Sequence, residues 1–242
     1  MIEGSIPITV ASVAAGHCVD YRLIQYSAVS ETDVQWLLAS LSPTEIPCLG
    51  LDTEFDGPAI GLIQLATNTR CLLITVPRVR GTGKIARNQP LDEVLSSNTI
   101  LKTGAELTTD ALLLYHNFGH RLNSGVDVTR VHYPSTLGEK QPNPQGLFAL
   151  YSHLCLPADQ PLAKDRQTTT TRWCGVSLTK KQIRYGVLDA WVSRGVALAR
   201  PAILQVADRL NLSGHRHAIL KLLGDWLAAD LSKCRYTTLI LF

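Results

Sequence analysis

Several signatures of common protein classes are missing from this 242-residue sequence. Its six cysteines include no C-x-x-C pair, so neither a disulfide framework nor a zinc site is indicated, and an intracellular, reducing compartment is expected, whether nuclear or cytoplasmic. The seven histidines form no H-x-x-H or H-E-x-x-H pattern, and the nucleophile motif G-x-S-x-G does not occur. No stretch approaches the roughly 20 apolar residues that span a bilayer, so we expect no membrane association.

Positively charged residues are only slightly more numerous than negatively charged ones. The chain has 23 Lys and Arg against 20 Asp and Glu, which gives a formal net charge of +3. Such a mildly basic protein is compatible with a polyanionic partner but lacks the charge density of a nucleic-acid coat protein. The N-terminal segment carries Glu3 and has no Lys or Arg before Arg22, which argues against a cleaved signal peptide.

Alternating patterns along the chain indicate an α/β domain. The segment Ser30-Glu31-Thr32-Asp33 predicts a capping-box start to an amphipathic helix that ends near Pro43. Three apolar runs separated by turn residues then predict a three-stranded antiparallel meander at 48–55, 60–67 and 70–76. Helix and strand patterns alternate after the meander, which predicts parallel strands joined by crossover helices. These are helices near 91–97, from 108 and at 145–155, with strands at 98–104 and 125–131.

The expected organisation is one domain with short extensions. Residues 1–20 lack a clear period and are predicted to be irregular, residues 21–200 form the domain, and residues 201–242 form a helical extension packed on it. Residues 78–88 carry four cations, no acid and two glycines, which is typical of an exposed basic loop. The polar stretch 157–178 suits a surface segment over a site.

Two acids project from one face of the first strand of the meander. In the run CLGLDTEF, side chains alternate across the strand, so Asp52 and Glu54 lie on the same face. Two carboxylates about 4 Å apart repel each other by on the order of 4 kcal/mol at an effective dielectric of about 20, and a divalent cation turns this repulsion into attraction. A solvated strand face is the alternative interpretation.

A third acid, Asp189, falls within an apolar stripe of the helix predicted from Thr179 to Arg200. A carboxylate in such a stripe is costly unless it is compensated. Tyr185 lies one turn earlier on the same face, so its hydroxyl reaches whatever Asp189 binds. The alternative is a buried aspartate satisfied by backbone donors beside a core tyrosine.

Asp110 lies in the first turn of the helix that begins near residue 108. Taken alone, an acid at this place is more often explained by its favourable interaction with the helix macrodipole than by metal binding. If the acids bind a metal, carboxylate ligands without thiolate or imidazole favour Mg²⁺ or Mn²⁺ over Zn²⁺.

Together these segments resemble the DEDD superfamily of 3′-to-5′ exonucleases, specifically the tyrosine branch that includes RNase D and the Werner-type exonuclease domain. Three motifs within residues 45–198 carry the resemblance: LGLDTEFD followed by GLIQLAT, then LKTGAELTTDALLL, then LTKKQIRYGVLDA. The histidine branch would carry His where this chain has Arg184, whereas Tyr185 marks the tyrosine branch. Thr103 and Glu106 depart from the apolar or small residues that are usual in the second motif.

The resemblance implies an RNase H-like fold, with a mixed sheet of five to six strands, three of them antiparallel, flanked by helices. It implies hydrolysis at the 3′ end of single-stranded RNA or DNA, with RNA slightly favoured, to release nucleoside 5′-monophosphates. Two Mg²⁺ or Mn²⁺ ions would be bound, with Asp52 bridging both, Glu54 and Asp189 completing the first site and Asp110 holding the second. Tyr185 would orient the attacking water.

Four further residues are candidates for substrate binding. Lys164 and Arg166 are candidates for contacts with phosphates. Lys164 and Trp173 resemble a basic residue and a tryptophan of the family, and Phe55 is a candidate wedge for the terminal base. Ordinary solvated charge and a core phenylalanine are the alternatives. The competing function is a catalytically silent adaptor that binds RNA or a protein partner in a nucleic-acid-processing complex. Retention of the four acids and Tyr185 argues against it.

Overall fold

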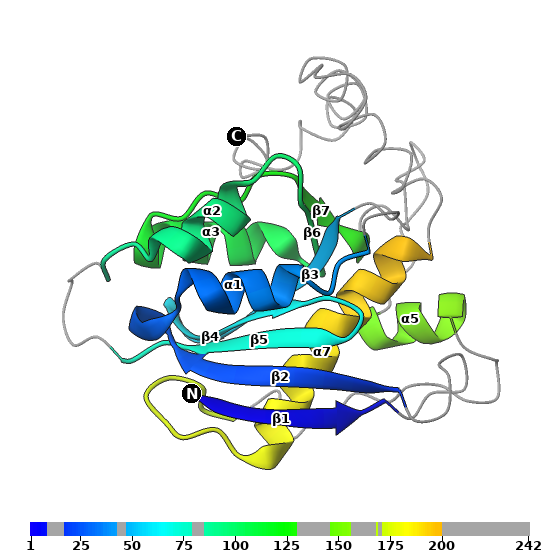
Figure 1. Cartoon of the computed structure of the whole chain (residues 1–242), viewed down its shortest axis with the longest axis horizontal. Helices are drawn as coiled ribbons and strands as arrows, with labels where there is room; N and C mark the ends of the chain where they lie inside the picture. The colour runs from blue at the N-terminus through cyan, green and yellow to red at the C-terminus, as the bar shows by residue number, and fades with distance from the viewer. Residues whose placement is uncertain are drawn as a thin grey trace.

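A seven-stranded mixed sheet runs through the centre of the structure, with helices on both of its faces (Figure 1). The computed structural model describes residues 1–8, 17–42, 47–78, 85–129, 146–155, 168 and 171–199. The strands lie in the order β1-β2-β5-β4-β3-β6-β7. Their bounds are β1 Ile2–Pro7, β2 Cys18–Gln25, β3 Cys48–Asp56, β4 Ala59–Ala66, β5 Arg70–Thr75, β6 Leu101–Gly104 and β7 Gly125–Asp127.

The predicted meander is confirmed, because β3 pairs antiparallel with β4 and β4 pairs antiparallel with β5. The predicted parallel strands are also confirmed: β6 pairs with β3, and β7 pairs with β6. β6 pairs only with Cys48–Gly50 of β3, so β3 continues well beyond the end of its neighbour. This overhang opens the edge of the sheet at the point where Asp52 and Glu54 lie.

The prediction of an irregular segment over residues 1–20 is wrong for residues 2–7 and 18–20. β1 pairs antiparallel with β2, and β2 pairs parallel with β5, so the sheet has two strands beyond the five that the sequence patterns located. β1 is a strand at the edge of the sheet with no fully buried residue, so it lacks the alternating hydrophobic pattern of a half-buried strand. A salt bridge of 2.9 Å joins Glu3 to its register partner Arg22.

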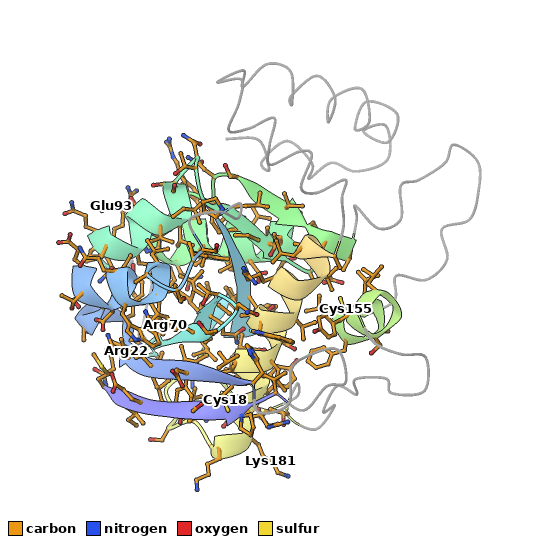
Figure 2. All side chains as sticks on the ribbon, turned by 45° about the vertical axis from the view of Figure 1, so that its right-hand side comes forward. Cys18, Arg22, Arg70, Glu93, Cys155 and Lys181 are labelled. Atoms are coloured by element: carbon orange, nitrogen blue, oxygen red, sulfur yellow. The ribbon has the colours of Figure 1, made fainter. Side chains whose placement is uncertain are left out.

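Three helices cover one face of the sheet: α1 Glu31–Leu38, α2 Gln89–Ser96 and α3 Leu107–Phe118. The capping box of Ser30 and Asp33 is confirmed at the start of α1. This helix ends at Leu38, before the expected Pro43, and the Ser40 hydroxyl donates to the carbonyl of Leu37 at 2.7 Å. Side chains fill the space on both sides of the sheet (Figure 2). The guanidinium groups of Arg22 and Arg70 both lie over the Trp36 ring of α1.

Two helices cover the opposite face, α5 Leu147–Cys155 and the long α7 Lys180–Leu198. Thr179 and Gln182 form a capping box at the start of α7. The helix crosses directly over β3, since a Cβ built at Gly50 would lie 1.7 Å from the carbonyl oxygen of Ala190. Only glycine permits this approach, which brings the neighbouring Asp189 next to the acids of β3.

Several sequence predictions lie outside the described residues. They concern residues 79–84 of the basic loop, most of 157–178 with Lys164 and Arg166, and the extension 201–242. The part of the chain that the structure describes contains no helix long and apolar enough to cross a membrane.

Candidate active site

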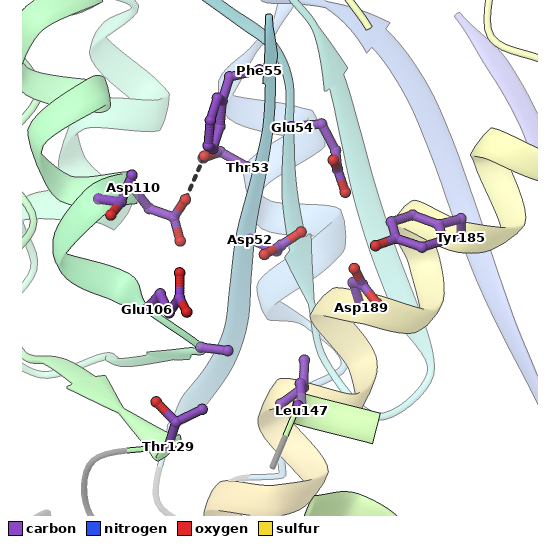
Figure 3. A pocket seen from close by; sticks show the side chains of 13 residues that line it. Asp52, Thr53, Glu54, Phe55, Glu106, Asp110, Thr129, Leu147, Tyr185 and Asp189 are labelled. Carbon is purple, nitrogen blue, oxygen red and sulfur yellow. Dashed lines mark hydrogen bonds between the residues drawn. The ribbon is translucent and has the colours of Figure 1, made fainter. Parts of the chain in front are cut away.

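A cavity of about 360 Å³ opens where β3, the first turn of α3 and the middle of α7 meet (Figure 3). β3 borders it with consecutive residues from Asp52 to Phe55, because β6 ends before this part of the strand. The start of α3 forms one wall and α7 forms the facing wall. All five predicted catalytic residues line this cavity: Asp52, Glu54, Asp110, Tyr185 and Asp189.

Three carboxylates converge in the cavity. One ligand atom each of Asp52, Glu54 and Asp189 lies within 4.8 Å of the others. Asp52 and Glu54 are half-buried on one face of β3, as the strand alternation predicts, and Asp189 is buried on α7. Three oxygen donors without a thiolate or imidazole among them fit a hard divalent cation such as Mg²⁺ or Mn²⁺, which would offset their mutual repulsion.

Asp110 borders the same cavity from the first turn of α3 but is not part of the group of three acids. It is buried, and Thr53 Oγ1 donates a hydrogen bond to its Oδ1 at 2.5 Å. Burial raises the pKa of Asp110 to about 7; the bond from Thr53 opposes this rise, and the charges of Asp127 and Glu106 add to it. A cation beside this carboxylate would stabilise its charged form.

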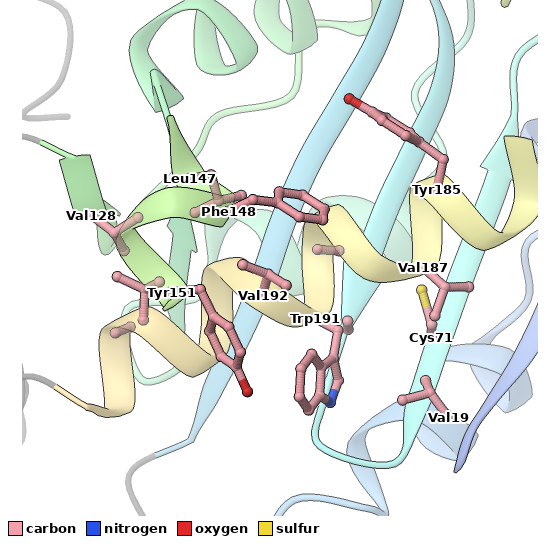
Figure 4. Close-up of a cluster of buried hydrophobic side chains, with 14 of the residues drawn as sticks. Val19, Cys71, Val128, Leu147, Phe148, Tyr151, Tyr185, Val187, Trp191 and Val192 are labelled. Carbon is pink, nitrogen blue, oxygen red and sulfur yellow. The ribbon is translucent and has the colours of Figure 1, made fainter. Parts of the chain in front are cut away.

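Tyr185 projects from α7 towards the carboxylates, one turn before Asp189 (Figure 3). Burial is the main cause of a strongly raised Tyr185 pKa, and the charges of Asp189, Glu54 and Asp52 raise it further. The phenol therefore keeps its proton at neutral pH and acts as a hydrogen-bond donor. Val187 and Val192 of α7 belong to the buried apolar cluster that packs this helix against the sheet (Figure 4).

The structure separates the two aromatic candidates for substrate binding. Phe55 is 42% exposed and borders the cavity, so the alternative of a core phenylalanine is wrong. Trp173 is 2% exposed and does not line the cavity; its ring centroid lies 5.9 Å from that of Tyr185. Trp173 therefore packs beside the catalytic candidate and presents no exposed surface to a substrate.

Among the cavity-lining residues that were not predicted from the sequence, Thr53 and Glu106 both act on Asp110. Thr53, between the two acids of β3, points to the opposite face of the strand and contacts Asp110. Glu106 lines the cavity and occupies the N-cap position of α3 in the left-handed conformation, with φ of 54°. In the sequence, Glu106 stands out only because the second motif usually has a small or apolar residue at this position.

The mixed sheet, the helices on both faces and the acids around one cavity define an RNase H-like nuclease fold. The model of the 3′-5′ exonuclease family matches residues 29–197, and the chain belongs to this family of nucleic-acid hydrolases. The exonuclease family predicted from the three motifs is confirmed. No functionally curated protein matches the chain in a sequence comparison.

Solved structures of exonucleases share the fold. RNase D of Escherichia coli is 21% identical with a TM-score of 0.57, and the match covers 86% of this chain but only 50% of that protein. NrnC of Brucella melitensis is 18% identical with a TM-score of 0.54, covering 88% of this chain and 94% of NrnC. The Nibbler EXO domain of Aedes aegypti is 18% identical with a TM-score of 0.53, covering 78% of this chain and 94% of that domain.

Proposed function

We propose that this protein is a divalent-metal-dependent 3′-to-5′ exonuclease that shortens single-stranded nucleic acid, with RNA slightly favoured over DNA. The convergence of Asp52, Glu54 and Asp189 within 4.8 Å, in a cavity that Tyr185 lines, carries the proposal. Membership of the 3′-5′ exonuclease family supports it. Among proteins of the same fold, NrnC has been solved bound to pGG and with bound Mg²⁺, and RNase D is an exoribonuclease involved in structured RNA processing.

The acids divide between two cation sites in this proposal. Asp52, Glu54 and Asp189 would hold the first cation, and Asp52 and Asp110, at the start of α3, would hold the second. When bound, such cations supply Lewis-acid chemistry, lowering the pKa of a water and neutralising the charge of a phosphodiester. Placement of the carboxylates on a strand and two helices keeps the ligand positions fixed before substrate binds.

Tyr185 orients the attacking water in this proposal. Its protonated hydroxyl donates a hydrogen bond to the water oxygen and leaves a lone pair directed at phosphorus. Attack forms a new P–O bond and breaks the bond to the 3′ oxygen of the preceding nucleotide; in the balance, one proton of the water passes to that oxygen and its OH remains on phosphorus. The products are a nucleoside 5′-monophosphate and a shortened strand with a free 3′ hydroxyl.

Three residues are proposed to contact the substrate. Phe55 presents an exposed ring beside the carboxylates, where a terminal base can stack on it. Lys164 and Arg166 are proposed to contact phosphates of the strand, which would make binding dependent on salt. A preference for RNA would require contacts with the 2′ hydroxyl.

The test is degradation of 3′-labelled and 5′-labelled single-stranded RNA and DNA with Mg²⁺, Mn²⁺ or EDTA. We expect a metal-dependent ladder from the 3′ end, abolished by Asp52→Asn and unchanged by Glu93→Gln, which removes an exposed carboxylate on α2. The faster substrate identifies the preferred sugar. Tight oligomer binding without cleavage would reject the exonuclease and favour the adaptor, and capture of a protein partner would extend that result.

A further inference from the structure

The last residue of β3, Asp56, makes contacts far along the chain. Its Oδ1 accepts the backbone N–H of Trp173 at 3.1 Å, and its Oδ2 accepts that of Cys174 at 3.0 Å. The sequence places Asp56 in the turn signal Asp56-Gly57-Pro58, yet its carboxylate binds a segment more than a hundred residues away. Hydrogen bonds to a charged acceptor are about twice as strong as neutral ones, so this is a firm attachment.

The segment 171–175 is held from two further sides. The Gln182 side-chain amide of α7 donates to the carbonyl of Arg172 at 3.0 Å and to the Thr171 hydroxyl at 3.2 Å. β4 lies directly against the same backbone, since a Cβ at Gly61 would fall 2.5 Å from the carbonyl carbon of Trp173. β3, β4 and α7 therefore all fix this segment.

The Trp173 side chain connects this fixed segment to the cavity. Its buried ring lies against Tyr185, with an angle of 43° between the two ring planes. Tyr185 in turn lines the carboxylate cavity. A continuous set of contacts thus runs from the Asp56 carboxylate through the Trp173 backbone and ring to the tyrosine.

We propose that Asp56 is a positioning residue for Tyr185: it fixes the segment 171–175, and the Trp173 ring of that segment sets the orientation of the tyrosine. This inference rests on the proposed function, in which the Tyr185 hydroxyl orients the attacking water. Asp56 touches neither cation nor substrate in this arrangement. Its loss lowers the rate of the chemical step and leaves substrate binding largely intact.

Asp56→Asn is the first variant, because it keeps the size of the side chain but sets an amide N–H₂ against one of the two backbone donors. Removing a supporting contact of this kind lowers activity by about 10- to 100-fold. We expect this loss in kcat, with KM changed by less than about twofold. Asp33→Asn is the matched control, since Asp33 is a buried aspartate that caps α1 on the opposite face of the sheet.

A double-mutant cycle with Tyr185→Phe separates positioning from general destabilisation. If Asp56 acts through the Tyr185 hydroxyl, Asp56→Asn causes no further loss once that hydroxyl is gone. Hydrogen exchange gives a readout independent of activity: the amides of Trp173 and Cys174 exchange faster in Asp56→Asn and not in Asp33→Asn. Should Asp56→Asn fail to fold, Asp56→Ser, which keeps one acceptor, takes its place.

The possible failures are distinguishable. A wild-type protein that degrades no oligomer rejects the proposed function itself. If the wild type is active, two results overturn the positioning role. Asp56→Asn either does not lower kcat, or lowers it equally in the wild-type and Tyr185→Phe backgrounds. A loss of kcat in Asp33→Asn as large as that in Asp56→Asn overturns the positioning role as well.

Discussion

Thr53 and Asp110 are joined by a hydrogen bond that links β3, which carries Asp52 and Glu54, to helix α3. Thr53 Oγ1 donates to Asp110 Oδ1 at 2.5 Å. Because side chains alternate along β3, Thr53 points away from Asp52 and Glu54 and towards the face that α3 covers. β3 therefore presents Asp52 and Glu54 on one face, and through Thr53 on its other face it binds the Asp110 carboxylate.

Substitution of Thr53 by valine tests what this bond contributes. Valine keeps the shape of threonine but cannot donate, so the Asp110 carboxylate loses a donor that favours its charged form. We expect the Mg²⁺ concentration needed for half-maximal activity to rise about tenfold, as for other partners that orient a ligand. Thr53→Ser retains the hydroxyl and serves as the control. Equal Mg²⁺ requirements in Thr53→Val and wild type would contradict a role in holding Asp110.

Replacement of Glu106 by glycine should stabilise the metal-free protein. Glu106 has φ of 54°, a conformation that costs an L-residue on the order of 1 kcal/mol and that glycine adopts freely. Its charge also contributes to the raised pKa of Asp110, after the larger effect of burial. We expect the free energy of unfolding to increase by about 1 kcal/mol in urea titrations with EDTA.

Glu106→Gln is the control for this prediction, because it removes the charge but keeps the side chain and its backbone conformation. A gain in stability in Glu106→Gln equal to that in Glu106→Gly would assign the effect to charge repulsion at Asp110. A loss of stability in Glu106→Gly would contradict the release of backbone strain.

Local geometry explains which parts of the site were predictable from sequence. The period of two in a strand places Asp52 and Glu54 together, and the period of an α-helix places Tyr185 one turn from Asp189. Both rules depend only on neighbouring residues. Turn residues and apolar runs likewise located the meander, and the order of three motifs identified the family.

Features that depend on distant pairing were not predictable in this way. The bond between Thr53 and Asp110 joins residues 57 positions apart, and that between Asp56 and Trp173 spans 117 positions. β1 escaped detection because its edge position leaves it without a fully buried residue. Its pairing with β2 depends on backbone hydrogen bonds that any sequence offers.

Lys102 gives a prediction about the folded state that is independent of catalysis. Its side chain is fully buried at the start of β6, where Nζ donates to the carbonyls of Ser97 at 2.6 Å and Ile100 at 2.8 Å. Burial lowers the Lys102 pKa to about 7 from 10.5. A neutral amine retains two N–H donors, enough for both carbonyls, so the side chain can lose its proton without losing these bonds.

The lowered pKa makes stability depend on pH in a defined direction. Below about pH 7 the folded and unfolded chains both bind the proton, and the cost of burying the charge is present in full. Between about 7 and 10.5 the unfolded chain binds the proton and the folded protein does not, so stability increases as pH rises. The slope approaches about 1.4 kcal/mol per pH unit in this range.

Comparison of wild type with Lys102→Met isolates the contribution of Lys102 to the pH dependence of stability. The contributions of all other titrating groups cancel in the difference between the two unfolding free energies. Urea unfolding between about pH 6.5 and about pH 9.5 should show the difference in unfolding free energy moving in favour of wild type as pH rises. Lys181→Met, at an exposed position on α7, is the matched control and should show a difference that stays level. A level difference for Lys102→Met as well would mean that Lys102 keeps its proton in the folded protein, held by the two carbonyls.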